Sequence, residues 1–525
     1  MSLSRLEQFL RSGSYRTAVM IGAVGSIIIA LTSHAVGAVR SRGGIMQELG
    51  LTSLTFGHSQ GMLMVVLWLG IGALIISWII VGGRILRVGE RLTWAAALAW
   101  TAPLLFAGPL MSRDVYSYLM QGTLARDGFN PYHEGAAANP GPLLFEVSPD
   151  WRNTTTPYGP LHLGIAELVT RVTGDNITGG VVAFKLISFA SVAVMAWALK
   201  ELAQLCGVRA DVAIWLGVLN PLSIIHLIGG MHNENMMMAV VLLALLLCLK
   251  FHPGWGIAGA ALIGVGVALK ATAFIALPFM VWVIVVRFGG RKWVTFLWSG
   301  FASVVAMIAS LSALTALTGQ TWGWVAEVTG NTKVINPLAL PSFIASTLAP
   351  ILSRFNDDIT FNAILSVVRP WTAGAMVLAM VLVWWLYKKD VISALEGITI
   401  AYLVTCVLNS VVLPWYYTAP LALVALWARR YWVIYAAAVF SMWISLMFDG
   451  GGNNRLYDLW WVLSLMAVCA WLASVCLGYR PRMTPGEEPD WDLRRSPSPE
   501  LGASLHEPGG REGRLLGGRA VSHPR

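Results

Sequence analysis

One carboxylate in a polar stretch is the best candidate for a catalytic base in this sequence. The stretch begins SRDVYSYLMQGTLARDGFNPYHEG at Ser112, directly after an apolar run, and its first acid is Asp114. A carboxylate at a membrane interface is partly desolvated, so a neighbour such as Arg113 can shift its proton affinity strongly. Such a group is suited to general-base catalysis. The alternative is structural, because Ser112 or Asp114 can instead cap a helix and complement its dipole.

A second polar cluster, GGMHNEN, interrupts two apolar runs. It places His232, Asn233, Glu234 and Asn235 at consecutive positions. Apolar helices do not normally expose such a cluster to lipid. The cluster is either the solvated tip of a hairpin, or His232 and Glu234 face a polar cavity, where they bind sugar hydroxyls or assist the base.

Isolated basic residues are candidates for binding an anion. Lys270 is the only charge in GAALIGVGVALKATAFIALP. An ammonium group there must snorkel, pair with an acid or bind an anion such as a phosphate. Lys333 and Arg455 are further candidates for the same role.

Two short motifs offer binding surfaces. LPWYY contains Trp415, Tyr416 and Tyr417. These rings form either part of an aromatic belt at the membrane interface or a platform for the apolar face of a pyranose. FDGGGNNRLYD contains three consecutive glycines, 450–452, which allow a close approach of the backbone to a ligand.

Membrane-spanning helices must position these residues. Of the 525 residues, 56% are hydrophobic and 12% are charged, which is too little polar surface for a soluble globule of this size. The apolar residues form blocks of about 18 to 25, the length of a membrane-spanning helix. We therefore predict an all-α polytopic membrane protein with about fourteen spans. They are expected near 17–39, 61–83, 92–111, 178–200, 210–229, 235–250, 255–271, 274–288, 293–316, 363–386, 391–412, 415–428, 431–448 and 459–477.

The basic residues predict the orientation of the chain. Arg and Lys concentrate before the first span and in every second loop after it, so both termini are expected in the cytoplasm. The predicted organisation is a cytoplasmic segment 1–16, a transmembrane catalytic domain 17–479 with external loops 112–177 and 317–362, and a disordered cytoplasmic tail 480–525. This topology accounts for the net charge of +9 without nucleic acid.

The first external loop is predicted to begin with an amphipathic helix. Over residues 113–126, Val115, Leu119 and Leu124 lie on one side of a helix, and Arg113, Ser117 and Gln121 lie on another. We expect this helix along the outer membrane surface. The aromatic side chains expected at headgroup level are Tyr116, Tyr118, Phe129 and Tyr132.

Missing signatures restrict the chemistry. The five cysteines form no CxxC pair, there is no HExxH, and GVGVALKAT lacks the spacing of a phosphate-binding loop. We predict buried thiols, no metal site and no bound cofactor. An external enzyme has little access to cytoplasmic nucleotide sugars, so it needs a donor carried by the membrane, such as a polyprenyl-phosphate sugar.

Several motifs together resemble a known family. SRDVYSYLMQG, DGFNPY, TTTPYGPLH, LNPLSIIHLIGGMHNEN, ALKATAFIALPF and LPWYY look like the actinobacterial polyprenol-phosphomannose-dependent α-1,6-mannosyltransferases of the multispanning GT-C type, which build the mannan backbone of lipomannan and lipoarabinomannan. The resemblance covers about residues 15–477. It implies transfer of mannose from polyprenyl-phosphate-mannose to a membrane-anchored mannoside acceptor, with inversion, at the external face of the plasma membrane.

The resemblance also implies roles for individual residues. Asp114 becomes the catalytic base and Lys270 the cation beside the leaving phosphate. The residues expected to bind substrate are Arg113, Tyr116, Tyr118, Tyr158, His232, Glu234, Lys270, Trp415, Tyr416 and Arg455. The alternatives are a transferase of another prenyl-phosphate sugar, arabinosyl or glucosyl, and a multispanning transporter or lipid flippase, which would carry internal repeats and polar sites at mid-membrane.

Overall fold

The computed structural model describes residues 3–330, 335–481, 491 and 493. Over these residues the protein is helical and has no strand. The α-helices are α1 (Leu3–Ser12), α2 (Tyr15–Val36), α3 (Ile45–Glu48), α4 (Gly57–Val88), α5 (Trp94–Thr101), α6 (Asp114–Arg126), α7 (Pro160–Thr173), α8 (Ile177–Leu205), α9 (Ala210–Gly217), α10 (Glu234–Lys250), α11 (Trp255–Leu269), α12 (Leu277–Phe288), α13 (Lys292–Leu317), α14 (Trp324–Gly330), α15 (Leu340–Leu352), α16 (Phe361–Leu386), α17 (Val391–Leu408), α18 (Thr418–Val424), α19 (Tyr431–Ile444) and α20 (Leu459–Leu477). The shorter helical turns are η1 (Thr52–Thr55), η2 (Ala102–Phe106), η3 (Ala136–Ala138), η4 (Pro142–Phe145), η5 (Pro149–Trp151), the π-helix η6 (Ser223–Gly229), η7 (Ala271–Ala276) and η8 (Pro414–Tyr417).

Eight helical segments in the described residues are long and apolar enough to cross a membrane. They are α2, α4, α8, the segment Ala271–Phe288, α13, α16, α17 and α20. The bent pair η6 and α10 makes a ninth if it is one span, and four shorter apolar segments lie at 94–106, 255–269, 340–352 and 431–444. Each of the fourteen predicted ranges contains helix. The protein is therefore a multi-pass membrane protein, and the count of fourteen spans stays a prediction.

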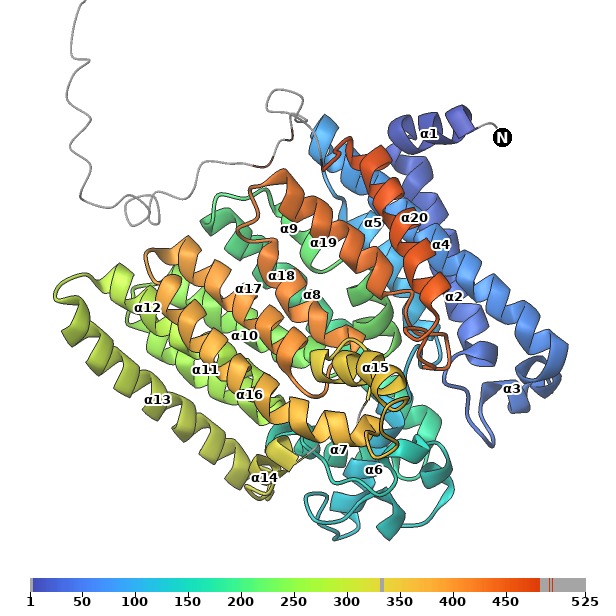
Figure 1. Cartoon of the computed structure of the whole chain (residues 1–525), viewed down its shortest axis with the longest axis horizontal. Helices are drawn as coiled ribbons and strands as arrows, with labels where there is room; N and C mark the ends of the chain where they lie inside the picture. The colour runs from blue at the N-terminus through green and yellow to red at the C-terminus, as the bar shows by residue number, and fades with distance from the viewer. Residues whose placement is uncertain (1–2, 331–334, 482–490, 492, 494–525) are drawn as a thin grey trace, which may run out of the picture.

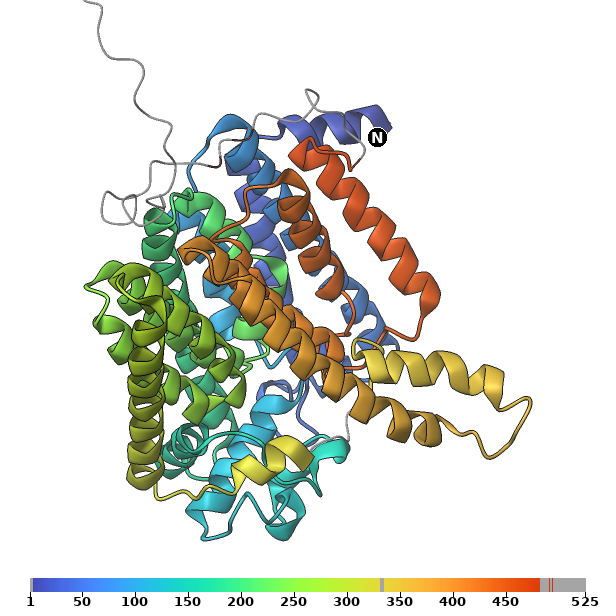
Figure 2. The ribbon, with the colours of Figure 1, turned by 60° about the vertical axis from the view of Figure 1, so that its left-hand side comes forward.

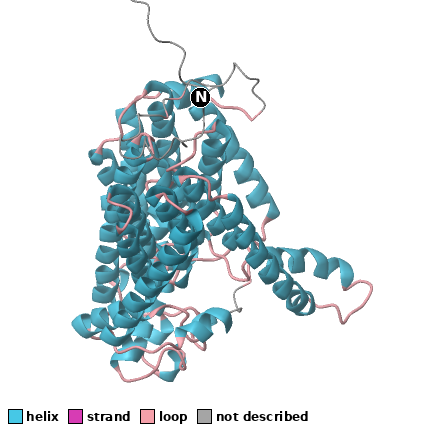
Figure 3. Cartoon of the chain, turned by 90° about the vertical axis from the view of Figure 1, so that its left-hand side faces the viewer, coloured by secondary structure: helices cyan, strands magenta, loops and turns pink. Residues whose placement is uncertain are grey.

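The helices form one body with the loops between α6 and α7 at one end (Figure 1). At the opposite end α1 lies near α20, so the two ends of the helical chain come together. The pair α15 and α16 extends sideways from the body (Figure 2). Helices joined by loops make up the described chain (Figure 3). The predicted external loop 317–362 thus contains α14 and α15. The predicted tail lies almost wholly outside the described residues.

Helix α6 confirms the predicted helix at 113–126, but not its position on the membrane surface. It packs against α7 and α8, and Tyr116, Tyr118 and Tyr132 are each 1% exposed. Their burial shows that these three side chains pack against protein and do not face lipid headgroups, while the depth of α6 in the membrane stays a prediction. Gly122 allows the close packing, because a Cβ there would lie 2.2 Å from the carbonyl oxygen of Ala166 in α7.

A predicted continuous span, 210–229, is broken in the structure. The side chain of Asn220 donates to the carbonyls of Leu216 and Gly217 and accepts from the backbone N–H of Ser223. It therefore satisfies the backbone where α9 ends. The chain continues as the π-helix η6 and turns by 111° into α10. The turn between η6 and α10 carries the HNEN cluster.

Candidate functional site

Asp114 is the first residue of α6, and its carboxylate faces a cavity. The Oγ of Ser112 accepts the backbone N–H of Asp114 at 3.1 Å. Since Ser112 satisfies this exposed donor, the Asp114 carboxylate is free to face away from the helix end. Its side chain is 14% exposed, and Oδ2 lies 3.2 Å from Nδ1 of His232. Ser112 therefore satisfies the first backbone N–H of α6, whose N-cap residue is Arg113 and has no side-chain capping bond. The Asp114 side chain does not cap the helix.

Three loops meet around this carboxylate. The backbone N–H of Met111 donates to the carbonyl of Gly450 at 2.8 Å, and that of Leu110 donates to Gly229 at 3.2 Å. Met111 and Met231 have φ angles of 60° and 58°, which are strained for residues with a side chain. Both positions directly precede polar motifs of the site, SRD and HNEN. Backbone strain is therefore concentrated where the motifs are held together.

The HNEN cluster is buried beside Asp114. His232, Asn233 and Asn235 have no exposed surface, and Glu234 is 1% exposed, so the cluster is not the solvated tip of a hairpin. The imidazole of His232 stacks on Trp415 with ring centroids 3.5 Å apart and an interplanar angle of 14°. Because Trp415 is 4% exposed, the aromatic-belt interpretation of this residue is wrong. Trp415 instead fixes the plane of His232 next to the carboxylate.

Lys270 pairs with an acid of the same cluster. Its Nζ forms an ion pair with Oε1 of Glu234, and the side chains are 11% and 2% exposed. The ammonium also lies over the ring of Tyr416, 4.0 Å from its centroid, and 6.0 Å from that of Tyr158. Lys270 therefore pairs inside the protein and does not snorkel to the surface.

Two cavities share Asp114 as a lining residue. The large cavity has a volume of about 720 Å³ and is lined by Asp114, Trp415, Gly452, Asn453 and Asn454, among others. The small cavity has about 80 Å³ of room for water centres and lies along α6. Its lining includes Asp114, Ser117, Gln121, Thr155, Tyr158 and Tyr416. Trp151 and Leu413 also line both cavities, so the two cavities adjoin at the Asp114 carboxylate.

The environment of Asp114 favours its charged form. Burial opposes ionisation, but the neighbouring His232, Ser112 and Lys270 outweigh it and lower the pKa of Asp114 below its usual value. Arg113 is not among the main groups that shift this pKa. The carboxylate is therefore ionised at neutral pH.

Neutral aromatic groups lie in the wall of the small cavity and next to it. Tyr118 lies edge-on to Tyr158 and His162, with centroids 5.5 and 4.7 Å away. Burial raises the pKa of both tyrosines well above the usual value, and burial together with Lys270 lowers the pKa of His162 to about 3. All three side chains are uncharged at neutral pH. The charges of the site are therefore those of Asp114, Glu234 and Lys270, with His232 beside them.

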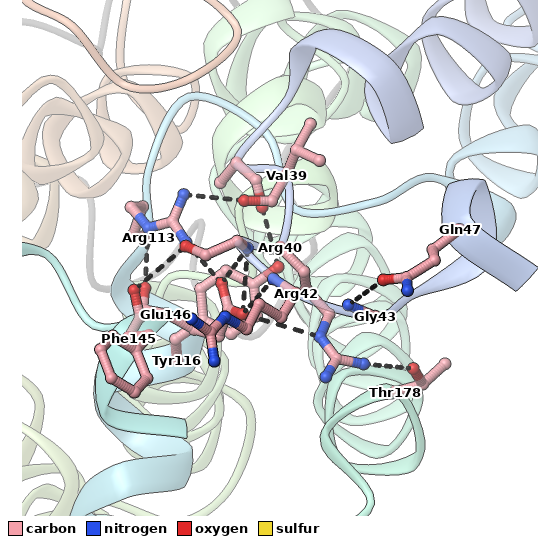
Figure 4. A network of polar contacts seen from close by, with 12 residues as sticks. Val39, Arg40, Arg42, Gly43, Gln47, Arg113, Tyr116, Phe145, Glu146 and Thr178 are labelled. Carbon is pink, nitrogen blue, oxygen red and sulfur yellow. Dashed lines mark hydrogen bonds and ion pairs between the residues drawn. The ribbon is translucent and has the colours of Figure 1, made fainter. Parts of the chain in front are cut away.

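Arg113 and Tyr116 point away from the Asp114 carboxylate. Arg113 donates to the carboxylate of Glu146 at 2.9 Å and to the carbonyls of Glu146 and Val39 (Figure 4). The hydroxyl of Tyr116 donates to the carbonyl of Ala38. Both side chains therefore hold the loop that follows α2 against the start of α6. The structure does not support the predicted influence of Arg113 on Asp114.

Of the two further phosphate candidates, Arg455 lies apart from this cluster. Arg455 is 3.6 Å from Asp449, its side chain is 45% exposed, and it is not among the residues lining either cavity. Lys333 lies outside the described residues. Gly452, with φ of 96°, packs against the backbone of Met111 and Ser112. The glycine motif thus serves a close approach of two loops.

Three residues with roles around the site were not predicted. Lys185 in α8 is 2% exposed and donates to the carbonyls of Ile228 and Gly229, where η6 ends. Glu146 is 1% exposed and accepts from Arg113 and the backbone of Ser41. His162 is fully buried. A lysine inside the apolar run GGVVAFKLISF was a usable signal for Lys185, whereas nothing local distinguished Glu146.

The described residues contain no group of three or more His, Cys, Asp or Glu side chains placed to hold a metal ion. All five cysteines are free and buried, as predicted.

The fold and the site define a multi-pass helical membrane protein with a buried polar site at one end. Residues 19–287 match the family described as Alpha-(1->6)-mannopyranosyltransferase, N-terminal domain, and residues 341–478 match the MptB C-terminal domain. The chain belongs to the Alpha-(1->6)-mannopyranosyltransferase family.

Relatives in this family are similar over most of their length. The chain is 45% identical to Alpha-(1->6)-mannopyranosyltransferase A of Corynebacterium glutamicum, over 86% of this chain and 96% of that protein. It is 35% identical to the protein of the same name from Mycobacterium tuberculosis, over 89% and 92%. Identity to Alpha-(1->6)-mannopyranosyltransferase B of C. glutamicum is 30%, over 78% and 73%. No solved structure matches the chain.

Proposed function

We propose that this protein is a GT-C-type mannosyltransferase that moves mannose from polyprenyl-phosphate-mannose to a membrane-anchored mannan acceptor, forming an α-1,6 linkage with inversion at the external face of the membrane. The observation that carries the proposal is the ionised Asp114 carboxylate between two cavities, with the Lys270–Glu234 pair close by. Names of the relatives supply the sugar and the linkage. The polyprenyl donor comes from the resemblance and from the need for a donor held in the membrane.

The proposed reaction is one displacement at the anomeric carbon. Asp114 accepts the proton of the acceptor 6-hydroxyl while the oxygen of that hydroxyl forms the new bond to C1 of the donor mannose. The C1–O bond to phosphate breaks, and its electron pair leaves with the polyprenyl phosphate. Lys270, with three donors and only one used toward Glu234 in the described contacts, stabilises the departing oxyanion. His232 holds Asp114 in its charged form.

Transfer of labelled mannose tests the proposal. Purified protein in proteoliposomes is supplied with labelled polyprenyl-phosphomannose and a short α-1,6-mannoside. We expect a labelled product that an α-1,6-mannosidase degrades. Asp114→Asn is expected to lower the rate by about 10²- to 10⁴-fold, the usual contribution of a general base.

Asp127→Asn is the matched control, because Asp127 follows the same helix but pairs with Arg126 at the surface. Near-normal turnover by Asp114→Asn would contradict the assignment of the base. Solute counterflow without a covalent product would favour a transporter, and transfer only from arabinosyl or glucosyl donors would change the sugar.

A further inference from the structure

A row of polar side chains on α6 lines the small cavity. Asp114, Ser117 and Gln121 follow the i, i+3, i+7 spacing of one helix face, and all three border this cavity. The Oγ of Ser117 and the Oε1 of Gln121 are buried and have no hydrogen-bond partner among the described residues. Buried polar atoms are nearly always satisfied. These two therefore point to a polar ligand or to water.

The lining of the small cavity suits a sugar. The cavity has about 80 Å³, which is room for several ordered waters or for the hydroxyl groups of a bound ligand. The lining combines Ser117, Gln121 and Thr155 with the rings of Tyr158 and Tyr416. Hydroxyl partners next to aromatic faces suit a hexose better than a prenyl chain.

The position of Lys270 indicates whether the hexose in the small cavity belongs to the donor or to the acceptor. Tyr416 and Tyr158, the rings nearest its ammonium, both line the small cavity. A phosphate bound by Lys270 therefore lies at the edge of this cavity. The large cavity, at about 720 Å³, shares Asp114, Trp151 and Leu413 with the small one and has room for several sugar residues. Donor and acceptor then meet at the shared carboxylate.

We infer that the small cavity is the subsite for the hexose of the donor, and that Ser117 and Gln121 hydrogen-bond its hydroxyls and set donor specificity. The inference rests on the proposed function, whose site it extends to residues outside the charged cluster. A subsite that pairs its buried polar groups with sugar hydroxyls discriminates strongly against donors lacking one of them.

Binding and transfer measured on the same variants test the subsite. Ser117→Ala and Gln121→Leu are compared with wild type and with the control Thr123→Val, since Thr123 lies on α6 beside a different pocket. Competition with a labelled prenyl lipid gives the affinities of polyprenyl-phosphomannose and of polyprenyl phosphate without sugar. Steady-state transfer gives separate KM values for donor and acceptor.

In wild type we expect the mannosyl lipid to bind more tightly than the lipid without sugar. Each variant should reduce this advantage about tenfold, as expected for one lost hydrogen bond, and should raise the donor KM but not the acceptor KM. In wild type, a deoxy-mannosyl donor that lacks the contacted hydroxyl should bind more weakly than the mannosyl donor by the same factor. In the variant, the two donors should bind equally well.

An unchanged sugar contribution in both variants, or a rise in the acceptor KM alone, would overturn the subsite. If wild type binds the mannosyl lipid in a Gln121-dependent way but transfers nothing, the proposed function fails while the sugar subsite stands. The two failures are therefore distinguishable.

Discussion

Replacing Lys270 by methionine tests two roles of this side chain, pairing with Glu234 and binding the leaving phosphate. Methionine keeps much of the length of the side chain but removes the ammonium, so the Glu234 carboxylate, 2% exposed, loses its partner. Removing one member of a buried ion pair costs about 3 kcal/mol or more. Loss of a cation beside a developing oxyanion costs about 10²- to 10³-fold in turnover. Lys270→Met is therefore expected to lower both stability and rate.

The double variant Lys270→Met/Glu234→Gln distinguishes the two effects. It leaves no unpaired charge, so most of the lost stability should return, with a remaining deficit of about 1 kcal/mol for the imperfectly paired amide. The rate should stay about 100-fold below wild type, because the leaving phosphate still lacks its cation. Glu234→Gln alone controls for the loss of the carboxylate.

Thermal unfolding in one detergent gives the stability of all four proteins, and initial rates at saturating acceptor give their turnover. The reasoning about Lys270 would be refuted if the double variant regained both the stability and the rate of wild type. That result would show that the ammonium acts only to neutralise Glu234.

Two further predictions concern the groups that hold the site. His232→Gln removes a neighbour that lowers the pKa of Asp114, so this pKa is expected to rise. The basic form of Asp114 is then lost at a higher pH, and the acid limb of kcat/KM moves to higher pH. An unshifted pH profile would exclude this role. Lys185→Met removes donors from the carbonyls of Ile228 and Gly229 and should lower kcat about tenfold with donor KM changed less than twofold, while Lys200→Met has no effect; equal kinetics in both variants would contradict positioning by Lys185.

The apolar runs predict the helices well but not their interruptions. Hydropathy reports that a segment avoids water, and all fourteen predicted ranges contain helix. It does not report where a distant side chain satisfies a broken backbone. The range 210–229 is interrupted where Asn220 binds the end of α9. Lys185 binds the carbonyls of Ile228 and Gly229 at the end of η6, which is also the end of that range. Lys185 belongs to another helix, so that contact depends on tertiary packing.

The residues correctly grouped at the site share one feature that a sequence can show. His232, Glu234, Lys270 and Trp415 all interrupt or border apolar runs, and the structure brings them together with Asp114. Tyr116 was misplaced because two residues along a helix turn a side chain by about 200°. The ion pair of Arg113 could not be predicted, because its partner Glu146 lies 33 residues away in a loop whose path no local pattern specifies. Arg113 also lines the large cavity, so its role in binding substrate stays a prediction.

The same chain breaks create the cavity and the chemistry. Irregular backbone is tolerated within a membrane protein where it is buried or lines a cavity. At each break near Asp114 a side chain forms hydrogen bonds with the free backbone groups. These side chains are Ser112 before α6, Lys185 after η6, and Asp449, which accepts from the backbone N–H groups of Gly451 and Asn453. These groups touch no substrate in the proposed reaction. Their loss moves the loops that carry the reacting side chains, so it should lower kcat as direct substitutions do. If continuous helix replaced these breaks, the cavity would be lost, and so would the position of the Asp114 carboxylate in its wall.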